Sequence, residues 1–218
     1  MPRHRERSRL VLPANAVASR DEIRRHRRCL VSNREMRLET PLRAPRLQLR
    51  TLGVADATKR YLEWMRDPEI NRYLESRFAE HSIESLARFI ETRNEGSTEL
   101  LLGICLVDGC HIGNIKLGPV EWHHRNAAVG LLIGEKDCWG KGYASEAIVT
   151  VATYAFADLA LEKLYAGCYA SNVGSARAFV KAGWTQEGRL GDHWLAGGRR
   201  DDGLQFGITR TEWAAGPG

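Results

Sequence analysis

The chain has 218 residues, of which 43% are hydrophobic, and it carries a formal net charge of +5 at pH 7. This length suits one ordinary α/β domain with a sizeable core and some additional chain. No apolar run approaches the roughly 20 residues that a membrane-spanning helix needs, so the sequence predicts no membrane partner.

The cysteines are widely spaced, odd in number and never arranged as a CxxC pair; they are Cys29, Cys105, Cys110, Cys138 and Cys168. This pattern predicts neither a disulfide framework nor a zinc site, and we expect no metal. Free thiols of this kind are typical of a reducing compartment, which favours a cytoplasmic location. Both a monomer and a homodimer are compatible with the sequence.

The positive charge is concentrated near the N-terminus, where residues 1–46 hold 13 arginines against 5 acidic residues. Clustered arginines can bind nucleic acid through its phosphates. The segment also lacks aromatic residues and apolar periodicity, which is typical of disorder. We therefore predict a basic, disordered extension over residues 1–45, with Met36 as an alternative start and no nucleic-acid partner. An ordered domain over 46–213 and a short tail over 214–218 complete the expected organisation.

The predicted domain opens with a strand and three helices. Residues 46–52 alternate apolar and polar side chains, as a half-buried strand does. A helix is predicted over 54–65, because its apolar residues share one helical face, and Asp67-Pro68 ends it. Pro68 opens a second short helix through residue 73. Ser82 is the expected N-cap of a further helix over 83–94.

The second half of the domain is dominated by strands. Strands are predicted over residues 99–107, 110–120, 127–134, 163–170, 185–190 and 204–209, and Asp108-Gly109 is a typical hairpin turn between the first two. Apolar helices are predicted over 146–161 and 175–184. The order predicts an α/β fold with a mixed, mostly antiparallel sheet of six or seven strands and about four helices.

One segment carries the features of an anion site. In LLIGEKDCWGKGYASEA a strand ends, Gly140 and Gly142 follow, and a helix begins at Ala144. The first N–H groups of a helix lack internal partners and lie at its positive end, so they can bind a diphosphate. Lys141 adds a cation. The segment is neither GxxxxGK[ST] nor the three-glycine dinucleotide fingerprint, which excludes these two nucleotide motifs.

The same segment resembles motif A of the GNAT N-acetyltransferases, with Trp139 where the family usually has Arg or Gln. The later stretch NVGSARAFVKAGW resembles motif B of that family. The similarity is greatest to the branch that acetylates ribosomal-protein N-termini and amino sugars. It covers about residues 46–211 and implies a GNAT-like sheet that is splayed between 127–134 and 163–170.

The resemblance implies that acetyl-CoA is the cosubstrate and that its pantetheine lies in the splayed gap. The residues that it assigns to acetyl-CoA binding are Leu132, Ile133, Gly134, Trp139, Gly140, Lys141, Gly142, Tyr143, Ala144, Ser145, Asn172, Ser175 and Phe179. In many relatives a tyrosine seven residues after the motif B asparagine acts as the general acid. Phe179 stands at that position, so the resemblance predicts no such acid here.

A base is needed because the attacking amine must lose a proton. Glu121 and His123 precede a central strand, where relatives place acceptor-side groups, and they are the predicted catalytic residues. A histidine with an ordinary pKa near 6.5 suits proton removal at neutral pH. The segment that holds Trp64, Tyr73 and Arg77 corresponds to the acceptor wall of relatives.

Two acceptors remain open at this point: a nucleotide-linked amino sugar and a protein N-terminus. Either would be acetylated on a primary amine by direct attack in a ternary complex. The alternative is a regulatory protein that binds acetyl-CoA with little or no turnover, which the missing tyrosine at position 179 favours.

Overall fold

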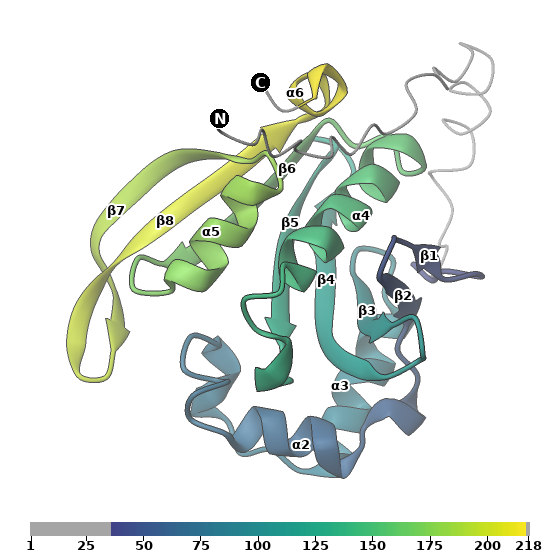
Figure 1. Ribbon diagram of the computed structural model, residues 1–218, viewed down its shortest axis with the longest axis vertical. Coiled ribbons are helices and arrows are strands. Elements are labelled where there is room, and N and C mark those ends of the chain that lie inside the picture. Colours follow the sequence, from purple (N-terminus) through teal and green to yellow (C-terminus); the bar gives the residue numbers. More distant parts are fainter. Residues whose placement is uncertain (1–35, 217–218) are drawn as a thin grey trace, which may run out of the picture. The chain divides into compact units, whose positions relative to one another are not determined.

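The computed structural model describes residues 36–216 (Figure 1). The disorder predicted for the N-terminal extension falls, for residues 1–35, outside the described residues. The last two residues of the chain also lie outside them. The strands are β1 (Leu42–Arg43), β2 (Leu47–Thr51), β3 (Leu100–Leu106), β4 (His111–Glu121), β5 (Asn126–Ile133), β6 (Lys163–Tyr169), β7 (Thr185–Ala196) and β8 (Arg199–Thr209). The α-helices are α2 (Lys59–Arg66), α3 (Ile83–Glu95), α4 (Tyr143–Ala157), α5 (Val173–Lys181) and α6 (Arg210–Ala215), and the 3₁₀ helices are η1 (Val54–Asp56), η2 (Glu75–Phe78) and η3 (Lys136–Cys138).

All eight strands form one sheet in the order β1-β2-β3-β4-β5-β6-β8-β7. Every neighbouring pair is antiparallel except β5 and β6, which are parallel and joined through α4. The predicted mixed, mostly antiparallel α/β sheet is therefore confirmed. The sheet also includes Leu42 and Arg43, which precede the expected start of the domain at residue 46.

Two cores lie on opposite faces of the sheet. The larger core packs α4 residues such as Ile148 and Val151 against alternate residues of the central strands, including Val129 and Leu164. The smaller core packs α2 and α3 against the other face, with Trp64 and Ile90 among its buried side chains. Successive side chains of a strand point to opposite faces of the sheet. The core in which a side chain of β5 or β6 is buried therefore shows which face of the sheet that side chain is on.

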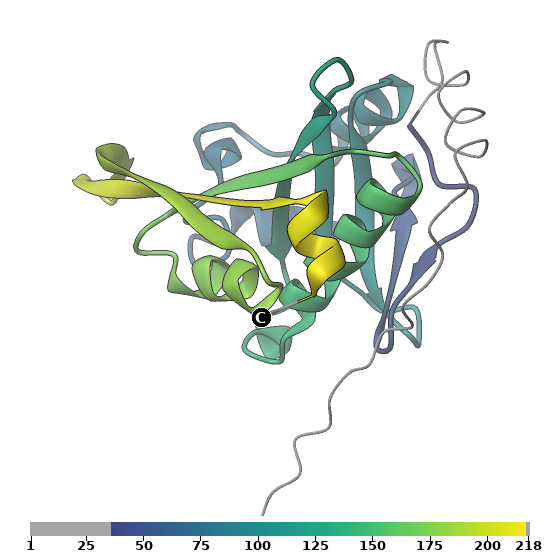
Figure 2. The same cartoon turned by 90° about the horizontal axis from the view of Figure 1, so that it is seen from above.

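Several elements differ from the sequence expectation. The helix predicted over 54–65 is divided into η1 and α2, and neither β1 nor α6 was predicted. The short helix predicted from Pro68 to residue 73 is a turn, and η2 follows it. The Asp67 side chain explains the change: it accepts a hydrogen bond from the Glu69 amide at 2.8 Å, which favours a turn over a helical continuation. The last two strands are longer than predicted, at 12 and 11 residues, and their hairpin extends to one side of the sheet (Figure 2).

Within the part of the chain that the structure describes, no helix combines the length and the apolar character needed to cross a bilayer.

Candidate functional site

The parallel strands β5 and β6 pair only at their beginnings. Their last paired residues are Ala128 and Tyr165, although β5 continues to Ile133 and β6 to Tyr169. Beyond this point β5 keeps its partner β4, and β6 keeps its partner β8. The facing edges of β5 and β6 therefore carry backbone groups that no strand satisfies, in a V-shaped gap that opens toward the C-terminal ends of both strands.

The register shows which β5 residues face this gap. The Gly134 amide donates to the Ile112 carbonyl at 2.8 Å, so Gly134 pairs with β4. Because hydrogen-bonded and non-bonded pairs alternate along an antiparallel ladder, Leu132, which lies opposite Asn114, also points its backbone at β4. The backbone groups of Leu132 and Gly134 therefore point at β4, and those of Leu131 and Ile133 face the gap. That Leu132, Ile133 and Gly134 bind acetyl-CoA stays a prediction.

Trp139 lies at the end of this gap-facing edge. Its indole N–H donates to the Ile133 carbonyl oxygen at 2.8 Å, and its side chain is 40% exposed. The indole thus folds back over the end of β5 and holds the loop that leads into α4.

The start of α4 has the geometry of an anion site. Gly140 and Gly142 have φ values of +71° and +84°, in the left-handed region that favours glycine. Gly142 is the N-cap and offers no side-chain acceptor, so the N–H groups of Tyr143, Ala144 and Ser145 remain available at the positive end of the helix. The predicted helix start is confirmed to within one residue.

Three cationic side chains surround this helix end. Arg46 donates to the Lys141 carbonyl at 3.0 Å, forms an ion pair with Glu146 at 2.7 Å, and lies over the Tyr143 ring. The Lys181 Nζ lies 3.3 Å from where a Gly142 Cβ would be, and within residues 36–216 it forms no ion pair. Lys141 is exposed. The cluster can neutralise a diphosphate, which fits the terminal part of coenzyme A.

The residues expected from motif B have separate structural roles. Asn172 is the N-cap of α5, and its side chain accepts from the Ser175 amide at 3.2 Å. Phe179 is only 1% exposed and stacks on Phe206 with ring centroids 5.6 Å apart. The Phe179 side chain therefore belongs to the core, and its contact with the cosubstrate stays a prediction.

The two predicted catalytic residues lie at the opposite end of β5. Glu121 is the last residue of β4 and pairs with Asn126, and His123 follows in the connecting turn. At about 3.3 Å per residue, roughly 20 Å of strand separates this turn from Ile133. Both residues precede the central strand β5, as expected, and the antiparallel β4–β5 hairpin places them at the closed end of the V. The prediction that Glu121 or His123 removes the proton is therefore not supported by their positions.

Glu135, which follows β5 by two residues, is connected to α2. Glu135 Oε1 accepts from Arg60 Nε at 2.6 Å and from Trp64 Nε1 at 2.8 Å. The hydrogen bond from Arg60 lowers the pKa of Glu135 below its ordinary value. Trp64 also packs on Gly134, where an added Cβ would lie 2.0 Å from the indole ring. These contacts fix α2 against the open end of β5.

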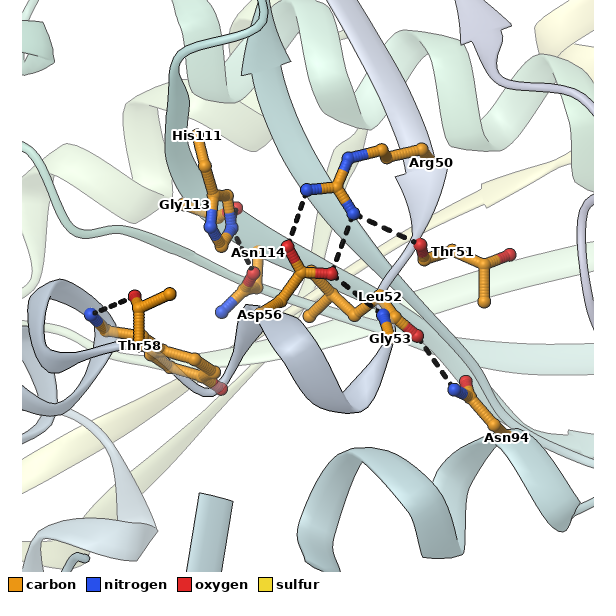
Figure 3. A network of polar contacts seen from close by, with 11 residues as sticks. Arg50, Thr51, Leu52, Gly53, Asp56, Thr58, Asn94, His111, Gly113 and Asn114 are labelled. Carbon is orange, nitrogen blue, oxygen red and sulfur yellow. Dashed lines mark hydrogen bonds and ion pairs between the residues drawn. The ribbon is translucent and has the colours of Figure 1, made fainter. Parts of the chain in front are cut away.

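A network of polar contacts that includes Arg50, Asp56, His111 and Asn114 lies near the N-terminus of α2 (Figure 3). Arg50 binds the Asp56 carboxylate at 2.6 and 2.7 Å, and the His111 Nε2 lies 2.8 Å from Asn114 Oδ1. Since both contacts of Nε2, Asn114 Oδ1 and the Gly113 carbonyl, are acceptors, this nitrogen carries a proton. Burial lowers the pKa of His111, which keeps the ring neutral. The Trp64 ring packs edge-on against it at 5.0 Å.

Known proteins with similar sequences are N-acetyltransferases. The uncharacterized N-acetyltransferase p20 of Bacillus licheniformis is 28% identical over 172 residues, covering 78% of this chain and 96% of p20. The spermidine N(1)-acetyltransferase of Vibrio cholerae is 26% identical over 102 residues, covering 47% of this chain and 58% of that protein.

Solved structures of acetyltransferases have a similar fold. A crystal structure of the Vibrio cholerae spermidine N-acetyltransferase in complex with CoA and spermine superposes with a TM-score of 0.68 at 23% identity, covering 77% of this chain and 97% of the other. A GNAT-family acetyltransferase from Bacillus anthracis also gives a TM-score of 0.68, at 22% identity, covering 79% and 99% of the two chains.

The family model described as the acetyltransferase (GNAT) domain matches residues 46–185, which include the strand β2, the smaller core, most of the larger core, the splayed strands and the α4 turn. This match agrees with the resemblance of the two sequence motifs. The chain therefore belongs to the GNAT family and is an acetyl-CoA-dependent N-acetyltransferase.

Proposed function

We propose that acetyl-CoA is held by the unpaired edge of β5 and by the N-terminus of α4. The observation that carries this proposal is the end of β5–β6 pairing at Ala128 and Tyr165, directly upstream of an uncapped helix start. The backbone of Ile133 and the amides of Tyr143 to Ser145 supply donors and acceptors. Arg46, Lys141 and Lys181 supply the positive charge that a diphosphate needs.

The acetyl group passes directly to a primary amine in a ternary complex. A backbone N–H on the open edge of β5 is suited to stabilise the negative charge that develops on the thioester oxygen. Covalent catalysis by cysteine is disfavoured, because burial raises the pKa of Cys168 and of Cys138 and leaves both as weakly nucleophilic thiols. The CoA thiol is a tolerable leaving group, with an ordinary thiol pKa of about 8.5.

The acceptor is a nucleotide-linked amino sugar or a protein N-terminus. The similarity to a spermidine acetyltransferase adds polyamines to this set. All three provide a primary amine, and they differ in charge: a nucleotide sugar is anionic, whereas a polyamine is cationic.

The experiment is thiol release from acetyl-CoA across a panel of amines, with calorimetric binding of acetyl-CoA measured alongside. The panel contains amino-sugar nucleotides, N-terminal peptides and polyamines. We expect release that depends on one class of amine, which also identifies the acceptor. Tight acetyl-CoA binding with no release on any amine would instead favour the regulatory alternative and contradict the proposed reaction.

A further inference from the structure

The face of the sheet opposite α4 is open where β5 and β6 separate. Gly130 and Gly167 follow the last paired residues by two positions, and both are exposed. Their strand neighbours Val129 and Ala166 belong to the α4 core, so the two glycines face away from it. A Cβ on Gly130 would meet no atom within 4 Å. At Gly167 the end of the Gln205 side chain lies 3.4 Å from the position of a Cβ, so the approach to the gap from this side is open over Gly130.

Gly130 and Gly167 together are called the glycine floor of the gap. Tyr169 lies beside this floor and forms one wall of the gap. It follows Gly167 by two residues on the same face of β6, about 7 Å along the strand, and only 4% of it is exposed. The rings of Tyr73 and Trp194 pack against it, with centroids 5.4 and 5.3 Å away. The wall therefore joins the segment between α2 and α3 to the β7–β8 hairpin, as the blue loop beside the hairpin in Figure 1 shows.

Glu75 is fixed on this wall. The Tyr169 hydroxyl donates to Glu75 Oε1 at 2.7 Å, and Arg77 donates to the Tyr169 oxygen at 3.0 Å. Arg77 also binds the Leu195 carbonyl at 3.1 Å, which anchors η2 to the hairpin. The Glu75 side chain is nevertheless 61% exposed. Its second oxygen, Oε2, accepts no hydrogen bond from any of residues 36–216.

Two other carboxylates lie at the open end, and each is also bound through one oxygen. Glu135 Oε1 accepts from Arg60 and Trp64, and Asp201 Oδ2 accepts from the Ser171 hydroxyl at 2.5 Å. The Glu75 side chain is the more open to an incoming amine, with 61% exposed against 27% for Glu135. The titratable and charged groups around Glu75 are Arg77, Tyr73 and Tyr169. Two more, Asp201 and His193, lie farther along the hairpin beside Trp194.

We propose that Glu75 is the acceptor-side carboxylate that receives the proton of the amine; this inference rests on the proposed direct transfer. The nitrogen lone pair of the free amine forms the C–N bond to the acetyl carbon, and the C–S bond breaks with its electron pair on sulfur. The amine proton passes to Glu75 Oε2, and the CoA thiolate takes a proton from solvent. Tyr169 and Arg77 are positioning residues that hold Oε1.

The test compares Glu75→Gln with Glu75→Ala, using the amine that the panel identifies. The amide of the glutamine variant can still accept from Tyr169 but cannot take a proton, so we expect kcat to fall about 100-fold with an acceptor KM within about 3-fold of the parent. The alanine variant should lose activity similarly and regain part of it in sodium formate, because a small carboxylate can enter the exposed site.

The matched control is Glu80→Gln, an exposed glutamate in the same segment, which should keep parental kcat. Acetyl-CoA affinity by calorimetry should be unchanged in all three variants, which shows that they are folded. Parental kcat in Glu75→Gln, or no formate rescue of Glu75→Ala, would overturn the assignment of Glu75 while leaving the acetyltransferase reaction intact. Failure of the parent enzyme with every amine would instead overturn the proposed function itself.

Discussion

His111 illustrates how a single half-buried side chain can link pH to stability. It is the first residue of β4, and its ring packs against Tyr61 and Trp64 of α2. Burial lowers its pKa below the ordinary value near 6.5. The unfolded chain therefore binds more protons than the folded chain between the two pKa values. It follows that this contribution to stability is complete above about pH 6.5 and is lost as the pH falls toward the folded pKa.

We predict that His111→Gln weakens this pH dependence. The glutamine amide can still donate to Asn114 Oδ1 but does not titrate, so the melting temperature of the variant should fall less between pH 7.5 and pH 5.5 than that of the parent. Loss of the contacts with Trp64 and Tyr61 should cost about 0.5–1.5 kcal/mol at pH 7.5. Thermal melts across pH check this, with His124→Gln in the exposed β4–β5 turn as the control. A variant whose pH slope equals the parental slope would contradict the role of His111.

Some residue roles could be predicted from sequence and others could not. The Gly140 and Gly142 turn is recognisable because a strand, two glycines and a helix follow in order. The position of Glu121 and His123 at the closed end of the V could not be predicted, because residue type does not show at which end of a hairpin a side chain lies. The backbone direction of Leu132 and Gly134 could not be predicted either, because it depends on the register with β4, which a one-residue shift would reverse.

At the scale of elements, the three cations beside the α4 N-terminus come from different parts of the chain: Arg46 precedes β2, Lys141 lies in the turn before α4, and Lys181 ends α5. Lys181 is the last residue of α5, yet its ammonium lies beside the Gly142 N-cap of α4. The sequence places these residues 39 positions apart, and only the packing of the two helices brings them together. This explains why Lys181 and Arg46 were missed by a search for local motifs.

We predict that Lys181→Met weakens acetyl-CoA binding about tenfold at low salt, because a charge-assisted contact to phosphate contributes about 1.5–3 kcal/mol and solvent screening reduces it. The difference from the parent should shrink as salt rises. Calorimetric titration checks this, and Lys59→Met, an exposed lysine on α2, is the control. Equal affinities of Lys181→Met and the parent would remove Lys181 from the site.

Elements were predicted well where local signals were strong. The Asp108-Gly109 turn is confirmed, with Gly109 at φ +88°, and Ser82 caps α3 as expected. The β7–β8 hairpin was predicted too short because most of β7 is exposed and does not alternate apolar and polar residues. The outer half of β7 forms a strand because it pairs with β8, and it is not buried. The alternation of apolar and polar residues does not detect a strand of this kind.

On the scale of the whole molecule, the gap between β5 and β6 can be reached from both faces of the sheet. The α4 side presents the helix end and its cations, and the opposite side presents the glycine floor and Glu75. Both substrates can therefore be bound at once, one from each face. This arrangement favours transfer in a ternary complex over transfer through an acetylated enzyme.

The most direct measurement of this claim is a two-substrate initial-rate study with acetyl-CoA and the identified amine, combined with intact-mass analysis of enzyme incubated with acetyl-CoA alone. We predict intersecting double-reciprocal lines, which indicate a sequential mechanism, and no acetylated enzyme. Parallel lines together with a stable acetylated enzyme would contradict direct transfer and would place a covalent intermediate on a residue such as Cys168.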